Sequence, residues 1–208
     1  MADVRISALP AASSATTGNE FAANQVGTTR KITLEQLHDA YVLGRGGAAT
    51  NINNSTTTTS IYSVSIPANV MGTNRTVRTR LQGEYWHSVG ATATMNIRIG
   101  LSTTTMWYDT SAALVVSTTS RPVNMDFDLT NLGATNSQLL WGKILIGEVV
   151  AITGWGELDT DEIMATTPFH GTAAVNTTSA VTLDVFVRHS VASTLVTYRH
   201  WTGYTELI

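Results

Sequence analysis

The side chains able to coordinate a metal are concentrated in one short stretch. Four carboxylates occur within six positions, at Glu157, Asp159, Asp161 and Glu162. Oxygen ligands of this kind suit Ca²⁺, but the ligand order and the glycine of an EF-hand loop are absent. A solvated acidic loop is therefore the preferred interpretation, and we expect no metal site and no cofactor.

Catalytic signatures are missing elsewhere in the sequence. A glycoside hydrolase needs two carboxyl groups facing the scissile bond, and no second acidic cluster stands at the end of a predicted strand. There is no P-loop, no dinucleotide fingerprint and no Gly-x-Ser-x-Gly motif. The absence of cysteine excludes a Cys nucleophile and a thiolate metal site. We therefore expect no catalytic residues and a protein that is not an enzyme.

The histidines are scattered, at positions 38, 87, 170, 189 and 200, without the spacing of a metal site. His38 is expected to pack on a predicted helix. His189 and His200 each follow an arginine in one of the last two predicted strands. If those strands pair, they bring basic residues together at a subunit contact or a threefold axis. Ordinary surface pairs are the preferred interpretation.

Aromatic side chains offer the other candidate chemistry, because exposed rings can stack on the apolar faces of sugars. Trp107 and Tyr108 lie in a short predicted strand or loop, and Trp155 is flanked by glycines. These are the best candidates for glycan contact. For any single aromatic residue, packing in the core or at an interface is the favoured interpretation.

The composition explains which partners are expected. Of 208 residues only 13% are charged, the net charge is −3, and about 35 residues are threonine. An acidic balance argues against nucleic-acid binding, and no apolar run is long enough for a transmembrane helix. The N-terminus lacks the apolar region of a secretory signal, so we expect synthesis and folding in a cytoplasm.

The elements that must position these residues are predicted to be strands. Residues 61–208 alternate apolar and polar side chains with turn residues between the runs. This pattern predicts an all-β fold, an antiparallel jelly-roll-like β-sandwich, with an immunoglobulin-type sandwich as the nearest alternative. The predicted strands span residues 61–66, 76–86, 92–101, 106–109, 113–116, 122–129, 138–153, 180–189 and 195–204.

Two further zones precede this body. Residues 1–44 form an arm with short strands at 4–9 and 29–32 and a helix that begins after Thr33 and ends at Gly44. The apolar set of the arm is too small for a core of its own, so we expect it to become ordered only against a partner; a frayed terminus is the alternative. Residues 45–60 are rich in Gly, Asn, Ser and Thr, which predicts a flexible or extended linker.

Short motifs in both parts resemble those of a known group of proteins. Residues 6–10 (ISALP) and 27–37 (GTTRKITLEQL) resemble the N-terminal segments of tailed-bacteriophage fibre and head- or tail-associated virion proteins. Residues 66–75 (IPANVMGTNR) and 129–136 (LTNLGATN) are similar to the β-rich distal domains that follow such segments. The resemblance implies a homotrimer in the virion whose arm attaches to other virion proteins of the head or tail. The attachment residues would be the apolar residues of the arm, Ile6, Leu9, Phe21, Val26, Ile32, Leu34, Leu37 and Tyr41.

The expected function is that of a virion structural protein, a fibre or decoration subunit whose β-domain contacts a host surface or reinforces the particle. Scarcity of charge favours subunit packing, and the only lysines are Lys31 and Lys143; low charge that merely accompanies β-composition is the alternative. A carbohydrate-binding adhesin module is the second candidate function, and a glycan-degrading spike is the least favoured. We expect no nucleic acid partner, no membrane insertion and, as the one further partner, a host-surface glycan.

Overall fold

The computed structural model describes residues 20–25, 28–33, 42–46, 49–88, 94–113, 117–147 and 165–208. The chain divides into two compact units, residues 1–42 and residues 43–208. All the described elements are strands and they pair in antiparallel fashion, which confirms the predicted all-β sandwich. Nowhere in these ranges is there a helix with the length and hydrophobicity to cross a bilayer.

The first unit contains a two-stranded antiparallel sheet, formed by β1 (Glu20–Gln25) and β2 (Thr28–Thr33). Phe21 lies opposite Ile32 in this pairing. The predicted strand at 29–32 is confirmed as part of β2, whereas the predicted strand at 4–9 and the residues of the predicted helix from 34 to 41 lie outside the described residues. The predicted helix end at Gly44 is wrong, because Gly44 belongs to a strand.

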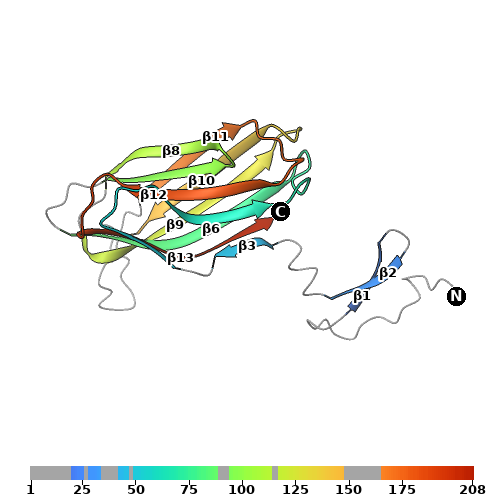
Figure 1. Ribbon diagram of the computed structural model, residues 1–208, viewed down its shortest axis with the longest axis horizontal. Coiled ribbons are helices and arrows are strands. Elements are labelled where there is room, and N and C mark those ends of the chain that lie inside the picture. Colours follow the sequence, from blue (N-terminus) through green and yellow to red (C-terminus); the bar gives the residue numbers. More distant parts are fainter. Residues whose placement is uncertain are drawn as a thin grey trace, which may run out of the picture. The chain divides into compact units, whose positions relative to one another are not determined.

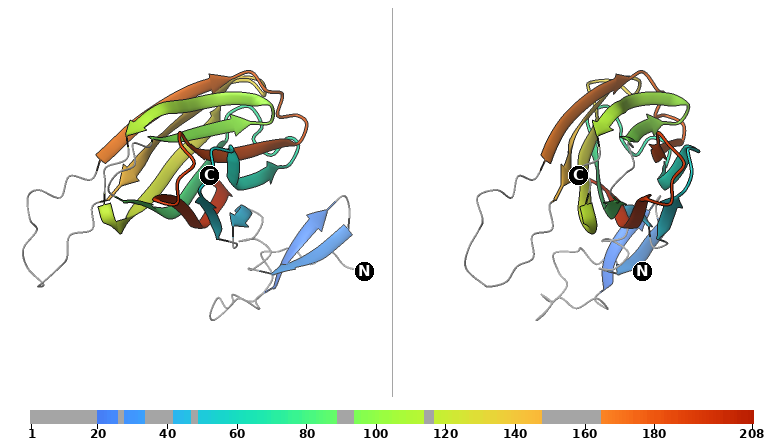
Figure 2. Two further views of the ribbon diagram at one scale, coloured as in Figure 1. Left: turned by 60° about the vertical axis from the view of Figure 1, so that its left-hand side comes forward. Right: turned by 90° about the vertical axis from the view of Figure 1, so that its left-hand side faces the viewer.

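The second unit is a sandwich of two sheets (Figures 1 and 2). The larger sheet has the strand order β11-β10-β9-β6-β13-β3, with β4 also pairing with β13, and the smaller sheet has the order β5-β12-β7-β8. Successive strands cross repeatedly from one sheet to the other. The strands are β3 (Val42–Gly46), β4 (Thr50–Asn53), β5 (Thr59–Ile66), β6 (Thr76–His87), β7 (Thr94–Leu101), β8 (Thr104–Ala113), β9 (Ser117–Asn131), β10 (Gln138–Ile146), β11 (Ala165–Ala173), β12 (Val181–His189) and β13 (Val196–Leu207).

The core lies between the two sheets and follows the alternation in the sequence. Side chains at every second position of β6, β7, β9 and β12 are buried, and most of their neighbours on the same strands face outward. Each fully buried aliphatic side chain contributes roughly 1.5–3 kcal/mol of transfer free energy. The inward residues predicted for these strands are confirmed: Val77, Thr79, Leu81, Gly83, Tyr85, Met95, Ile97, Ile99, Leu101, Val123, Met125, Phe127, Leu129, Val181, Leu183, Val185 and Val187.

The stretch predicted as a linker, residues 45–60, differs from that expectation. It contains the end of β3, all of β4 and the start of β5. Tyr198 of β13 lies opposite Ile52 of β4, and the Ile52 side chain is buried in the core. The Tyr62 hydroxyl donates a hydrogen bond to the Gly44 carbonyl at 3.2 Å. Pairing with the body thus supplies the free energy that the composition of this segment lacks.

Several strand boundaries also differ from the prediction. The two short strands predicted at 106–109 and 113–116 are one strand, β8, as far as Ala113. The prediction missed β11, which contains Pro168 and few apolar residues. Proline is tolerated there because β11 is the edge strand of the larger sheet. The long run predicted at 138–153 forms β10 up to Ile146, and the residues beyond 147 lie outside the described range.

A buried polar network holds the loops at one end of the sandwich. The Asn131 amide donates to the Gly72 carbonyl at 2.6 Å and to the Thr177 hydroxyl at 2.9 Å. The Gln138 amide donates to the Asn131 side-chain oxygen at 2.8 Å and to the Thr135 carbonyl at 3.1 Å. Because buried amides are costly when unpaired, this network fixes one arrangement of the loops that join both sheets.

Candidate functional site on the outer sheet faces

The outer face of the larger sheet carries a ladder of charged and aromatic side chains from several strands. Arg78 of β6 lies opposite Asp128 of β9, and Asp128 lies opposite Trp141 of β10. The neighbouring row runs from Tyr204 through Arg80 and Asp126 to Lys143. Because side chains alternate along each strand, both rows point away from the core.

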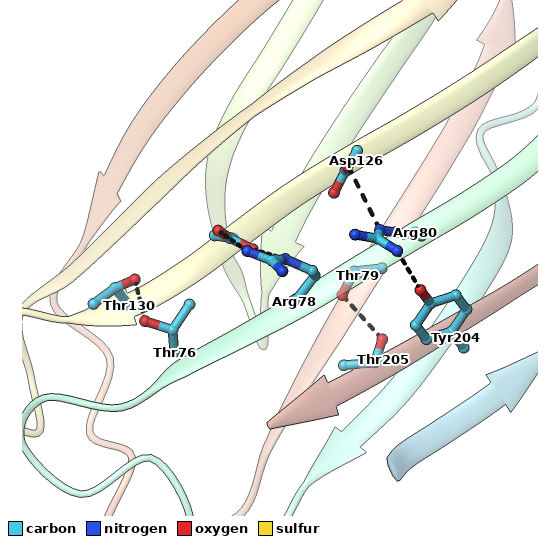
Figure 3. Close-up of polar contacts among 9 residues, drawn as sticks. Thr76, Arg78, Thr79, Arg80, Asp126, Thr130, Tyr204 and Thr205 are labelled. Atoms are coloured by element: carbon cyan, nitrogen blue, oxygen red, sulfur yellow. Dashed lines mark hydrogen bonds and ion pairs between the residues drawn. The ribbon is translucent and has the colours of Figure 1, made fainter. Parts of the chain in front are cut away.

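The charges of this ladder pair with each other (Figure 3). Arg78 makes a bidentate contact with Asp128, with Nε to Oδ1 at 2.9 Å and Nη2 to Oδ2 at 3.1 Å. The hydrogen bond with Asp128 raises the pKa of Arg78 above its ordinary value. Arg80 Nε lies 3.6 Å from Asp126 Oδ2, and its Nη1 donates to the Tyr204 hydroxyl at 2.8 Å. The guanidinium groups are therefore held in place by partners on adjacent strands.

Trp141 stands beside this ladder with 64% of its surface exposed. It borders a shallow hollow of about 340 Å³ that the ion pairs also line. The next residue, Gly142, lies against the backbone of Asp126 and Phe127, where a Cβ atom would overlap them. A flat exposed indole next to fixed hydrogen-bonding groups can stack on one face of a sugar ring and bind its hydroxyl groups.

Trp141 is not among the contact residues predicted from the sequence. The residue lies in the uniformly apolar run of β10, where the pattern predicts burial. The only sequence signal that favoured exposure was the alternation Leu140, Trp141, Gly142, in which the indole falls on the face opposite Leu140. The structure confirms this alternation, since Leu140 is buried.

The outer face of the smaller sheet carries a second hollow, of about 290 Å³. Tyr108 of β8, Arg98 of β7 and Phe186 of β12 form one row across it. Arg188 of β12 lies opposite Asn96 of β7 in the next row. All five side chains line the hollow, together with Thr58, Thr105 and Val187.

The predicted glycan-contact residues differ in their surroundings. Tyr108 is 47% exposed and lines the second hollow. Trp107 is half-buried, packs against the core and stacks on Phe169 with a centroid distance of 4.4 Å. Trp155 lies outside the described residues. Trp201, which the sequence analysis did not select, is 48% exposed and lies under the Arg199 guanidinium.

Two of the predicted attachment residues, Phe21 and Ile32, lie in the described part of the chain. Phe21 lies in β1 and Ile32 in β2, as paired positions of the small sheet. Ile6, Leu9, Val26, Leu34, Leu37 and Tyr41 lie outside the described residues, as do Glu157, Asp159, Asp161 and Glu162 of the acidic stretch. Among the residues that the structure does describe, no group of His, Asp and Glu side chains is placed to hold a metal ion.

The expected surface positions of two histidines are wrong. His189 of β12 and His200 of β13 are both buried, with exposed fractions of 0% and 1%. Their strands belong to different sheets and do not pair. Alternation places each histidine inward and the preceding arginine outward, which sequence analysis of the dipeptide alone did not take into account. Burial lowers the pKa of both imidazoles.

Comparisons with known proteins give distant similarities. No family model and no curated protein sequence matches the chain. It is similar to the CBM2 module of the evolved Dit of Lactobacillus casei BL23 phage J-1, with 9% identity, a TM-score of 0.33 and coverage of 91% of this chain and 80% of that one. It is also similar to the structure of infectious bursal disease virus Gt strain, with 15% identity, a TM-score of 0.26 and coverage of 96% and 50%. At these TM-scores neither similarity bears on function.

Proposed function

We propose that this chain is a bacteriophage virion structural protein, a trimeric fibre or decoration subunit. In this proposal residues 1–42 attach to other virion proteins, and the sandwich projects to contact a host surface or to reinforce the particle. The observation that carries the proposal is the division of the chain between Val42 and Leu43. All the described members of the core cluster, from Ile52 to Tyr198, belong to the second unit, and we propose the first unit as the attachment element.

The surface composition supports assembly of several copies. Only 13% of the residues are charged, and the outward positions of β4 and β5 are Thr, Ser and Asn. Packing such a surface against a second copy removes few charges from water, and desolvation of charge is a main cost of burying polar surface. Linked copies also multiply weak contacts with a host surface through avidity.

Light scattering on the purified chain tests the oligomeric part of the proposal. We expect a mass three times the 22.3 kDa of one chain. A stable monomer at micromolar concentration would contradict the proposed trimer.

Truncation tests the attachment role. Deletion of residues 1–42 should leave a folded sandwich that no longer joins particles, whereas full-length Trp141→Ala should join them normally. Incorporation of the truncated chain at the level of the full chain would refute the assignment of residues 1–42 as the attachment element.

The exposure of Trp141 favours a second candidate function, carbohydrate binding by the sandwich as an adhesin module. The Trp141 indole is 64% exposed beside fixed ion pairs, so packing of the fold does not account for a large aromatic side chain at this position. We expect the full chain to bind glycans on an array and Trp141→Ala to lose that binding. Trp201→Ala, which removes another exposed indole of the same sheet, is the matched control and should retain it.

A further inference from the structure

The hollow on the outer face of the smaller sheet differs from the Trp141 face in its charge. Among the side chains that the structure describes, its lining includes Arg98 and Arg188 and no carboxylate. Asp184, two residues before Phe186 on β12, lies opposite Gly100 and is not part of the lining. The hollow is therefore positively charged.

The Arg98 guanidinium is held flat by its neighbour. Its central carbon lies 4.1 Å from the centroid of the Phe186 ring. Stacking on an aromatic face fixes the plane of the group, and because Nε is buried, the two Nη groups form the edge that a planar partner can reach. Rigid placement lowers the entropy that a ligand contact must overcome, so this arginine is pre-organised for a bidentate oxyanion.

Both arginines lack an anionic partner within the described part of the chain. The Nε of Arg98 is buried and donates no hydrogen bond there. The ion pairs found in that part of the chain all involve other arginines, Arg78, Arg80 and Arg199. An unpaired guanidinium in a partly buried position favours an anion supplied from outside.

The remaining lining residues suit a sugar. Tyr108 offers a half-exposed ring at one end of the row, and Thr58, Thr105 and Asn96 offer hydroxyl and amide groups. An aromatic surface with a few convergent polar groups is the usual construction of a small-molecule site. The two arginines can bind an anionic group, and the neutral polar side chains around them can bind the hydroxyl groups of the same ligand.

We propose that this hollow binds an acidic saccharide, a sugar that carries a carboxylate or a phosphate group. Arg98 and Arg188 bind the anionic group, Tyr108 packs on the ring, and Asn96 bonds to a hydroxyl. The biological purpose of such binding rests on the host-contact role proposed above. The new elements are the binding site and the class of ligand.

A matched ligand series on the full-length chain tests it. Galactose, galacturonate and galactose 6-phosphate share one ring and differ at C6, where they carry a hydroxyl, a carboxylate and a phosphate. Amide chemical shifts of ¹⁵N-labelled protein should change on β7, β8 and β12 with galacturonate or galactose 6-phosphate, and at least about tenfold higher galactose should be needed. Which acidic sugar binds more tightly identifies the anionic group. Binding should weaken as salt rises.

Variants then assign the binding to the arginines. Arg98→Gln should weaken galacturonate or galactose 6-phosphate binding about tenfold or more, and Arg98→Lys should restore only part of it because ammonium lacks the planar fork. Arg188→Gln, at an exposed position, provides the same test if Arg98→Gln fails to fold. Arg75→Gln is the control, because it removes an equal charge from an exposed side chain that donates to the Val70 carbonyl.

Three outcomes would overturn the proposal: equal affinity for galactose and the two acidic sugars, no shift changes with either acid, or unchanged binding in both Arg98→Gln and Arg188→Gln. None of these outcomes affects the mass or particle-incorporation measurements, so failure of this inference and failure of the proposed virion role are distinguishable.

Discussion

The two sheets of the sandwich use their outward arginines differently. On the larger sheet Arg78, Arg80 and Arg199 each face a carboxylate on a neighbouring strand. On the smaller sheet Arg98 stacks on Phe186, and Arg188 faces Asn96. The first face satisfies its own charges and stabilises strand pairing, whereas the second face retains positive charge for a ligand.

The difference arises from register. Strand β9 carries Asp126 and Asp128 on its outer face, and its pairing with β6 sets them opposite Arg80 and Arg78. The pairing of β12 with β7 sets Arg98 opposite an aromatic residue instead. Cross-strand pairs therefore decide whether an arginine on a sheet is a structural or a binding group.

The edge where β11 of the larger sheet packs against β8 of the smaller sheet, called the seam below, is expected to be the part of the fold whose substitution costs most stability. Gly171 of β11 lies so close to Met106 of β8 that a Cβ atom would overlap the Met106 backbone. Gly171→Ala should therefore lower the free energy of unfolding by about 3 kcal/mol, through overpacking that the backbone cannot relieve. Denaturant unfolding measures the loss.

Gly100→Ala is the matched control for the seam. Gly100 is also within a strand, but its Cβ would meet only the Thr104 carbonyl, at 3.3 Å. We expect a much smaller loss than for Gly171→Ala. Equal losses in the two variants would show that the sheets separate easily at this edge.

Each sheet also buries a histidine whose pKa is lowered, so acid should destabilise the fold. Burial lowers the pKa of His189 and His200 below the ordinary value of 6.5, and neither imidazole has a hydrogen-bond partner. Below about pH 6.5 the unfolded chain gains protons that the folded chain does not. Stability is thus fully present above that pH and falls as pH decreases, by up to about 1.4 kcal/mol per pH unit for each histidine.

Thermal unfolding between pH 7.5 and 4.5 measures this dependence. His189→Leu should flatten it by removing one of the two imidazoles with a lowered pKa, and it leaves no polar atom of its own unpaired. His170→Gln, at an exposed position of β11, should leave the slope unchanged. A slope that His189→Leu does not alter would show that this imidazole becomes protonated in the folded state without cost.

The paired and unpaired arginines should differ in stability as well as in binding. Arg78→Gln should cost about 1 kcal/mol, because it breaks a bidentate pair whose side chains are 33% and 23% exposed. Arg98→Gln should cost about 0.5 kcal/mol, because it loses the stacking on Phe186 but also removes an unpaired nitrogen. Urea unfolding with and without 1 M NaCl measures both, and only the Arg78 effect should shrink in salt. The reverse ranking would contradict the division of roles between the two faces.

The smallest effect is expected at Trp141. Trp141→Ala should change stability by no more than about 0.5 kcal/mol, because most of the indole is in contact with solvent. Guanidinium unfolding measures it. A loss above about 1 kcal/mol would show that the indole packs on the sheet and that its exposure is no argument for a binding face.

Much of the sandwich could be predicted because its strands alternate. The inward residues of β6, β7, β9 and β12 are recognisable from a local period of two. The sequence of β4 and β11 has no such period, and these strands form because a neighbouring strand offers them hydrogen bonds. The candidate sites were predicted only in part: Tyr108 was identified as a possible contact, whereas Trp141 and Arg98 were not, because their importance depends on residues from other strands.

By itself the sequence determined the class of fold and, for each alternating strand, which side chains face the core, since both depend on residues close together along the chain. The tertiary structure alone decided which strands pair and in which register. Those choices depend on contacts between residues far apart in the chain. They set arginines of the larger sheet opposite carboxylates and left Arg98 and Arg188 of the smaller sheet open to an anion.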